Sequence, residues 1–119
     1  MPLRIGVAAS GGQGLDAMVA DRFGRAEKFV IVDIDEERGK ILKVETHDNP
    51  GYSAGSGAGV KAAQKLGDLG VKIYVGPTPG PNAYAALQYL GIKIYTLTGV
   101  TVREAVEAVI RNLPEILQS

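Results

Sequence analysis

The first third of the chain contains three short segments whose apolar residues are typical of β-strands. Residues 3–9 (LRIGVAA) form a nearly continuous apolar run, and residues 28–35 (KFVIVDID) are rich in β-branched side chains. Residues 40–46 (KILKVET) follow across a short polar turn that ends in Gly39, so these last two segments are predicted to form a hairpin. Between the first two segments, residues 15–20 have room for a turn or two of helix. The short connections predict three mostly antiparallel strands.

From Val60 onward, the apolar spacing changes to helices that alternate with strands. Val60, Ala63 and Leu66 fall on one helical face. The predicted elements are a helix that Gly70 ends, a strand over 71–75, a helix over 83–90 with Asn82 as N-cap, a strand over 92–97, and a helix that starts at a Thr101–Glu104 capping box and ends at Pro114. Because helical crossovers join parallel strands, we predict an α/β fold with a mixed five-stranded sheet and helices on its faces.

Composition indicates one ordinary globular domain over residues 1–119. Hydrophobic residues make up 45% of the chain and charged residues 22%, and thirteen basic residues balance thirteen acidic ones. A balanced charge predicts neither a nucleic-acid nor a membrane partner. The N-terminal residues MPLRIGV do not resemble a signal peptide, and no apolar run approaches the roughly 20 residues that span a bilayer. We therefore expect a cytoplasmic protein.

The residues that usually carry catalysis or bind metals are scarce. The sequence contains no cysteine, so it has no thiolate ligand for zinc or for an iron–sulfur cluster. His47 is the one histidine and could supply a single ligand to a preassembled cluster, or it could be an ordinary surface residue. No serine lies in a nucleophile-elbow motif, and the paired carboxylates fall along a strand and in a turn. The sequence therefore predicts a protein that is not an enzyme.

Two glycine-rich loops each follow a strand and precede a helix. Residues 55–59 (GSGAG) lead into one helix and residues 76–83 (GPTPGPNA) into the next. The first loop is not a phosphate-binding loop of the Walker type, because Val60 separates Gly59 from Lys61 and Ala62 follows the lysine. Either its amides bind an anion at a helix start, or its glycines allow close packing. If the strands run parallel, the loops at 10–14, 49–59 and 76–82 lie near one edge of the sheet.

The loop from Ser10 to Gly14 leaves a nucleotide-binding alternative open. Gly12-Gln13-Gly14-Leu15-Asp16-Ala17 matches G-x-G-x-x-A after a strand, and Asp33 lies near the end of the next strand. However, a parallel crossover needs a helix of roughly ten residues or more. The Arg22-Phe23-Gly24-Arg25 segment interrupts that helix. Its two arginines could face an anionic ligand, or pair with neighbouring carboxylates such as Asp21 and Glu27.

Several motifs, in their order along the chain, resemble the dinitrogenase iron–molybdenum cofactor biosynthesis family. The resemblance extends from about residue 3 to residue 110. The motifs are Phe23-Gly24-Arg25-Ala26, the strand end Val32-Asp33, Asn49-Pro50, Gly57-Ala58-Gly59 with Lys61-Ala62-Ala63, Gly80-Pro81-Asn82-Ala83, and Leu90-Gly91-Ile92-Lys93-Ile94-Tyr95.

This resemblance implies a ribonuclease-H-like fold and a protein that binds or carries a metal–sulfur cluster, of iron–molybdenum or iron–sulfur type, without turnover. It implies donor and acceptor proteins as partners, and we expect a monomer or weak homodimer. His47 would be the only direct metal ligand, and the missing cysteines favour transient carriage. The implied binding residues are Gly11, Gly12, Phe23, Gly24, Arg25, Asn49, Gly57, Gly59, Gly80 and Asn82. Backbone amides at two helix starts, with Arg25 nearby, would stabilise a negatively charged cluster.

Two other functions remain open from the sequence. One is a nucleotide- or phosphate-binding domain, with or without enzymatic activity, that uses the loop from Ser10 to Gly14. The other is an interaction module without a small-molecule ligand.

Overall fold

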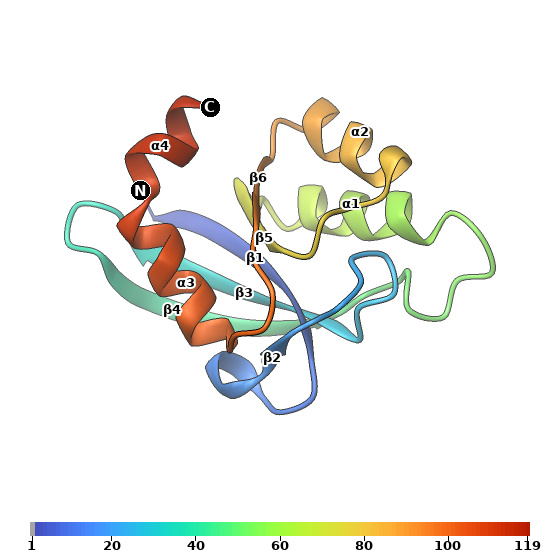
Figure 1. The fold of residues 1–119 in the computed structure, drawn as a ribbon, viewed down its shortest axis with the longest axis horizontal. Coiled ribbons are helices and arrows are strands. Elements are labelled where there is room, and N and C mark those ends of the chain that lie inside the picture. The colour runs from blue at the N-terminus through green and yellow to red at the C-terminus, as the bar shows by residue number, and fades with distance from the viewer. Residues whose placement is uncertain (1) are drawn as a thin grey trace.

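The computed structural model describes residues 2–119, which form one mixed sheet covered by helices on both faces (Figure 1). The elements in chain order are β1 (Leu3–Ser10), the 3₁₀ turn η1 (Gly14–Asp16), β2 (Met18–Val19), β3 (Lys28–Asp35), β4 (Lys40–Asp48), α1 (Ala58–Asp68), β5 (Ile73–Gly76), α2 (Pro81–Tyr89), β6 (Lys93–Thr96), α3 (Val102–Arg111) and α4 (Leu113–Gln118).

The sheet has the mixed pairing that the connection lengths predict. Its strand order is β4-β3-β1-β5-β6, with β2 paired to the end of β1. Strand β3 is antiparallel to both β1 and β4, whereas β5 is parallel to both β1 and β6. The three antiparallel N-terminal strands and the two parallel strands are thus confirmed. The predicted count of five was one short, because it omitted β2.

The segment between β1 and β3 is where the structure differs most from the sequence prediction. In place of a turn or two of helix over 15–20, the chain makes one 3₁₀ turn and then pairs Val19 with Ala9 across β2 and β1. Strands β1 and β3 are antiparallel neighbours, so no parallel crossover joins them. The dinucleotide fingerprint at Gly12 therefore lacks the strand–helix–strand unit that it needs.

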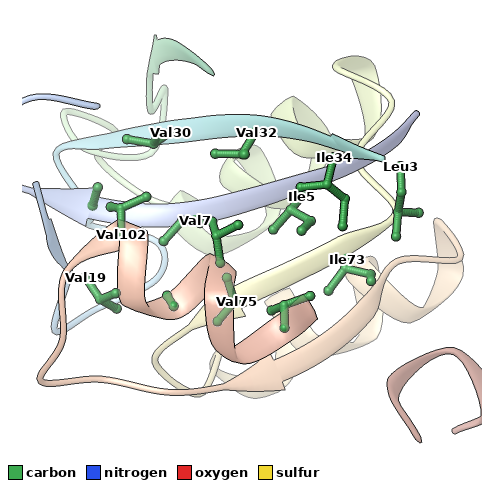
Figure 2. Packing of buried hydrophobic residues seen from close by; sticks show 14 of the residues in the cluster. Leu3, Ile5, Val7, Val19, Val30, Val32, Ile34, Ile73, Val75 and Val102 are labelled. Atoms are coloured by element: carbon green, nitrogen blue, oxygen red, sulfur yellow. The ribbon is translucent and has the colours of Figure 1, made fainter. Parts of the chain in front are cut away.

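Alternation along the strands divides the core between the two faces of the sheet. On one face, the strand residues Val7, Val32 and Val75 pack beneath Val102 and Val106 of α3. Figure 2 shows this packing, with the labelled valines and isoleucines of β1, β3 and β5 beside Val102. The other face is covered by α1 and α2, and its buried residues are Phe29, Ile31, Ala62, Leu66, Tyr74 and Leu87, among others. Both faces of the central strands are therefore buried from solvent.

Helix boundaries follow the predicted caps in part. Thr101 and Glu104 form the predicted capping box at the start of α3, and Gly70 and Gly91 adopt positive φ values of 75° and 74° after α1 and α2. Helix α2 begins two residues earlier than predicted, at Pro81, and Gly80 rather than Asn82 is its N-cap. Pro114 does not end the helical region, because it lies in the first turn of α4, where its missing N–H is tolerated. Across residues 2–119, none of the helices has the length and apolarity needed to span a membrane.

Candidate functional site

A cleft of about 470 Å³ lies where the N-terminal ends of α1 and α2 meet. Three segments line it: residues 21–25 before β3, residues 57–60 at the start of α1, and residues 78–83 around the start of α2. Strand β5 leads directly into the third segment, so the cleft lies beyond the carboxyl end of a parallel strand. Seven of the predicted binding residues line it: Phe23, Gly24, Arg25, Gly57, Gly59, Gly80 and Asn82.

Both helix starts at the cleft have main-chain amides without helical partners. Helix α1 begins after Gly57 and α2 after Gly80, and neither helix has a side chain that caps its first turn. The first helical bonds are donated by the amides of Lys61 and Tyr84, so the amides of residues 58–60 and 82–83 have no acceptor within their own helices. The helix dipoles place partial positive charge at the same ends. The two helices thus present donors suited to an anion.

The glycines at the cleft serve close packing as well as an open loop. A Cβ added to Gly24 would lie 2.9 Å from the amide nitrogen of Gly59, and one added to Gly59 would lie 2.9 Å from the Cβ of Ala83. Gly57 adopts a left-handed conformation with φ 68°, whereas a Cβ at Gly55 would meet nothing within 4 Å. Packing therefore explains Gly24 and Gly59, and backbone conformation explains Gly57. These glycines also let the two helix starts approach each other.

Asn49 lies behind the cleft wall and is 4% exposed. Its Nδ2 donates to the carbonyl oxygens of Phe23, Gly24 and Ala26 at 3.3, 3.2 and 2.9 Å, and its Oδ1 accepts from the amide of Gly51 at 2.9 Å. These bonds join the segment before β3 to the loop after β4. The side chain that the family resemblance implies as a binding residue is thus occupied by main-chain groups of the protein itself.

The two arginines beside Phe23 have different surroundings. Arg25 Nη1 donates to the carbonyl oxygens of Gly51 at 3.3 Å and Ala54 at 2.5 Å. Arg22 is exposed and lines the same cleft. Within residues 2–119, the Arg22 side chain has neither a hydrogen-bond partner nor an ion-pair partner. The sequence left open whether both arginines face an anion, and the resemblance implied only Arg25; the structure places Arg22 at the cleft as well.

Phe23 is fixed by an aromatic contact beneath the cleft. Its ring centroid lies 4.8 Å from that of Tyr74 with an interplanar angle of 77°, an edge-to-face arrangement. The Tyr74 hydroxyl donates to the carbonyl oxygen of Pro77 at 2.5 Å, and burial raises the pKa of this phenol. Tyr74 thus connects the first wall of the cleft to the segment that leads to Gly80. The sequence marked Tyr74 only as a strand residue, so nothing local indicated this role.

Two predicted residues, Gly11 and Gly12, lie outside the cleft lining. Both follow β1 and adopt positive φ values of 60° and 61°. The carbonyl oxygen of Gly12 accepts a hydrogen bond from Lys28 Nζ at 2.6 Å. Strands β1, β4 and β5 run in the same direction, so the loops that follow them lie at one edge of the sheet, as predicted. The loop from Ser10 to Gly14, however, contributes no residue to the cleft lining.

The predicted metal ligand, His47, lies on the edge strand β4, apart from the cleft lining. Its Nε2 lies 2.8 Å from Glu45 Oε1, and Lys43 Nζ lies 2.7 Å from Glu45 Oε2. Hydrogen bonds from Lys43 and His47 lower the pKa of Glu45 to about 2. In the part of the chain that the structure describes, no group of three His, Cys, Asp or Glu side chains is arranged to hold a metal ion. A metal at the cleft would thus need ligands from elsewhere.

Comparisons with known proteins agree with the architecture and with the resemblance. A family model described as dinitrogenase iron–molybdenum cofactor matches residues 2–112. The apo form of the orange protein from Desulfovibrio gigas is similar, with a TM-score of 0.78 and 38% identity over 94% of this chain and 87% of that chain. The NMR structure of TM1290 from Thermotoga has a TM-score of 0.71 and 36% identity, and the match covers 92% of this chain and 88% of that one.

Among curated proteins, the uncharacterized protein MJ0580 of Methanocaldococcus jannaschii is 32% identical over 89 residues, which is 75% of this chain and 74% of that protein. The family model covers nearly the whole chain, and the folds of the structural relatives correspond to the sheet and helices described above. The chain therefore belongs to the dinitrogenase iron–molybdenum cofactor family.

Proposed function

We propose that this protein binds and carries an anionic metal–sulfur cluster, of iron–molybdenum or iron–sulfur type, in the cleft between the starts of α1 and α2. The observation that carries the proposal is the convergence of two uncapped helix starts on one cleft that Arg22 and Arg25 also line. Family membership supports the cofactor class. The relative from Desulfovibrio gigas is described as an apo form, a term for a protein that also has a ligand-bound state.

The donor set suits an anion that arrives with its own sulfur ligands. The chain has no cysteine, so it offers no thiolate to complete a metal's coordination. Main-chain amides and a guanidinium can instead donate charge-assisted hydrogen bonds to sulfide or oxo atoms at the surface of a complete cluster. Asp21 is the single carboxylate among the described residues that line the cleft. The local balance of charge therefore favours a negative guest.

The cleft has the size of a small-molecule site. Its volume of about 470 Å³ falls within the roughly 300–1,000 Å³ of typical ligand pockets. Hydrogen bonds without covalent metal–protein bonds allow the guest to leave intact. We therefore propose a carrier that receives the cluster from a donor protein and releases it to an acceptor, with no turnover.

The direct test is anaerobic incubation of the purified protein with a molybdenum–sulfur anion, tetrathiomolybdate, and separately with a synthetic iron–sulfur cluster. Gel filtration with visible absorption and metal analysis would then measure what co-elutes with the protein. Stoichiometric metal and colour in the protein peak are expected for at least one probe. A protein peak free of both would refute the proposed function.

A matched pair of substitutions at Gly80 separates binding at the helix start from a general change in stability. Gly80 has φ −64° and a Cβ there would meet nothing within 4 Å, so a side chain fits without strain. Asp and Asn are both good N-caps, so Gly80→Asp and Gly80→Asn should each leave α2 at least as stable. Only Gly80→Asp adds a negative charge, and it should weaken probe binding by about tenfold or more relative to Gly80→Asn. Equal affinities would place the anion elsewhere.

A further inference from the structure

The two arginines of the cleft differ in what holds them, although only two residues separate them. Phe23 lies between them, is 3% exposed, and packs against the rings of Phe29 and Tyr74. This anchor fixes the backbone from which both arginines project. Arg22 and Arg25 both line the cleft and each contributes one positive charge. Their contribution to the overall field is therefore similar, and any difference in function must come from specific contacts.

The contacts of Arg25 connect it to the loop between β4 and α1. One nitrogen, Nη1, donates to two carbonyl oxygens of that loop, those of Gly51 and Ala54. Asn49 joins the same two segments from the buried side, since it donates to the carbonyls of residues 23, 24 and 26 and accepts from the Gly51 amide. Figure 1 shows that this loop extends away from the sheet before it returns to begin α1. Arg25 and Asn49 thus connect the fixed segment before β3 to the extended loop between β4 and α1.

The loop that Arg25 holds leads directly into the donors of the cleft. Gly51 lies against the carbonyl oxygens of Gly24 and Ala58, so its position affects the first residue of α1. Residues 57–60 at that helix start line the cleft. A displacement of the loop would therefore displace the amides that are proposed to face the anion.

Arg22 has no such restraint. Arg22 lines the cleft, its guanidinium carries five N–H donors, and among residues 2–119 it has no acceptor or carboxylate partner. A guanidinium can donate two parallel hydrogen bonds to an anion in a fork that an ammonium group cannot reproduce.

We infer that the two arginines have divided roles: Arg22 contacts the anionic guest of the cleft, and Arg25 is a positioning residue that holds the loop at 51–57 and, through it, the start of α1. The Arg22 half of this inference rests on the proposed function. The Arg25 half does not, because it concerns the protein without a guest. The family resemblance, by contrast, implied Arg25 and not Arg22 as a binding residue.

The test combines hydrogen exchange of the free protein with binding of tetrathiomolybdate to the full chain. Arg22→Ala, Arg25→Ala and the corresponding lysine variants are compared with Arg38→Ala, which removes an equal charge at the exposed hairpin turn. Arg22→Ala should weaken binding by about tenfold or more and leave exchange at residues 51–57 at the wild-type rate. Arg25→Ala should speed exchange in that loop by about tenfold while the global unfolding midpoint changes little.

The lysine variants distinguish the two roles further. Arg25→Lys should restore most of the loop's protection, because an ammonium group can still donate to the two carbonyls, whereas Arg22→Lys should recover only part of the affinity, since the fork is lost. Wild-type loop exchange in Arg25→Ala, or wild-type affinity in Arg22→Ala, would overturn the respective assignment. If the wild-type protein binds no probe, the Arg22 assignment fails together with the proposed function, and the exchange data still decide the role of Arg25.

Discussion

Gly24→Ala is the substitution that most directly tests how the cleft is built. The added methyl group would lie 2.9 Å from the Gly59 amide nitrogen, 3.0 Å from the Gly59 Cα and 3.2 Å from the Ala58 carbonyl carbon. All three are backbone atoms, so no rotamer change can relieve the overlap. Because ordinary contacts begin near 3.4 Å, the segment before β3 and the start of α1 would have to separate by about 0.5 Å.

The expected cost is that of overpacking a close contact between two backbones. Inserting a methyl group into a well-packed site typically costs about 1–3 kcal/mol. For a chain of this length, each kcal/mol lowers the melting temperature by about 3–5 °C, so Gly24→Ala should lower it by about 3–15 °C. The same displacement separates residues 21–25 from the α1 amides, so affinity for a cleft anion should fall as well.

The assay is thermal and urea unfolding of Gly24→Ala beside Gly55→Ala. Gly55 is the matched control because it is exposed, belongs to the loop that leads to α1, and has nothing within 4 Å of an added Cβ. The control should stay within about 0.5 kcal/mol of the wild type. If the stability of Gly24→Ala also falls within that range, the close approach between the segment before β3 and the start of α1 is wrong, and so is the geometry of the cleft.

Three further predictions concern the scaffold. Thr101→Ala removes a capping box and should cost about 1 kcal/mol in urea unfolding, with the exposed Thr98→Ala as a neutral control; equal effects would contradict the cap. Tyr74→Phe leaves the carbonyl of Pro77 without its donor and should lower the free energy of unfolding by about 1–3 kcal/mol. An unchanged unfolding midpoint would show that this hydrogen bond contributes nothing to stability. The low pKa of Glu45, about 2 in the folded protein, stabilises the fold above the unfolded value near 4.5, and this stabilisation is lost as the pH falls toward 2. Glu45→Gln should therefore differ from the wild type at neutral pH and converge with it in acid; a constant difference would refute the linkage.

The sheet and its helices were predictable because their signals are local and repeated. A nearly continuous apolar run and a segment rich in β-branched residues marked the long strands β1 and β3, and the lengths of the connections distinguished antiparallel from parallel neighbours. Strand β2 was missed because two residues are too few to show a hydrophobic pattern, and only their pairing with Ala9 and Ser10 makes them a strand. Helix α4 was missed because Pro114 is compatible with both a helix end and a helix start, and the sequence does not show which.

The position of the site was easier to predict than the roles of its residues. Glycines before two helices indicated the cleft walls, and seven of the predicted residues line it. The carbonyl partners of Asn49 and Arg25 lie 23 to 29 residues away along the chain, and main-chain carbonyls have no sequence signature. His47 was chosen because it is the one histidine, and Gly12 because it lies in a glycine-rich loop after a strand; the resemblance then implied both. The structure places them elsewhere, on β4 and in the loop after β1.

The cleft's proposed donors include main-chain amides at two helix starts, and the directions of those amides depend on backbone position and not on side-chain identity. Substitutions that move the backbone, at Gly24, Asn49 or Arg25, should therefore lower stability or loop protection and anion affinity together. Substitutions that change charge without moving the backbone, Arg22→Ala and Gly80→Asp, should lower affinity alone. Across such a set of variants, affinity should separate into these two classes when it is plotted against unfolding midpoint and loop exchange. If the variants that move the backbone kept wild-type affinity and only those that change charge lost it, side chains would hold the guest and the helix starts would be incidental to its binding.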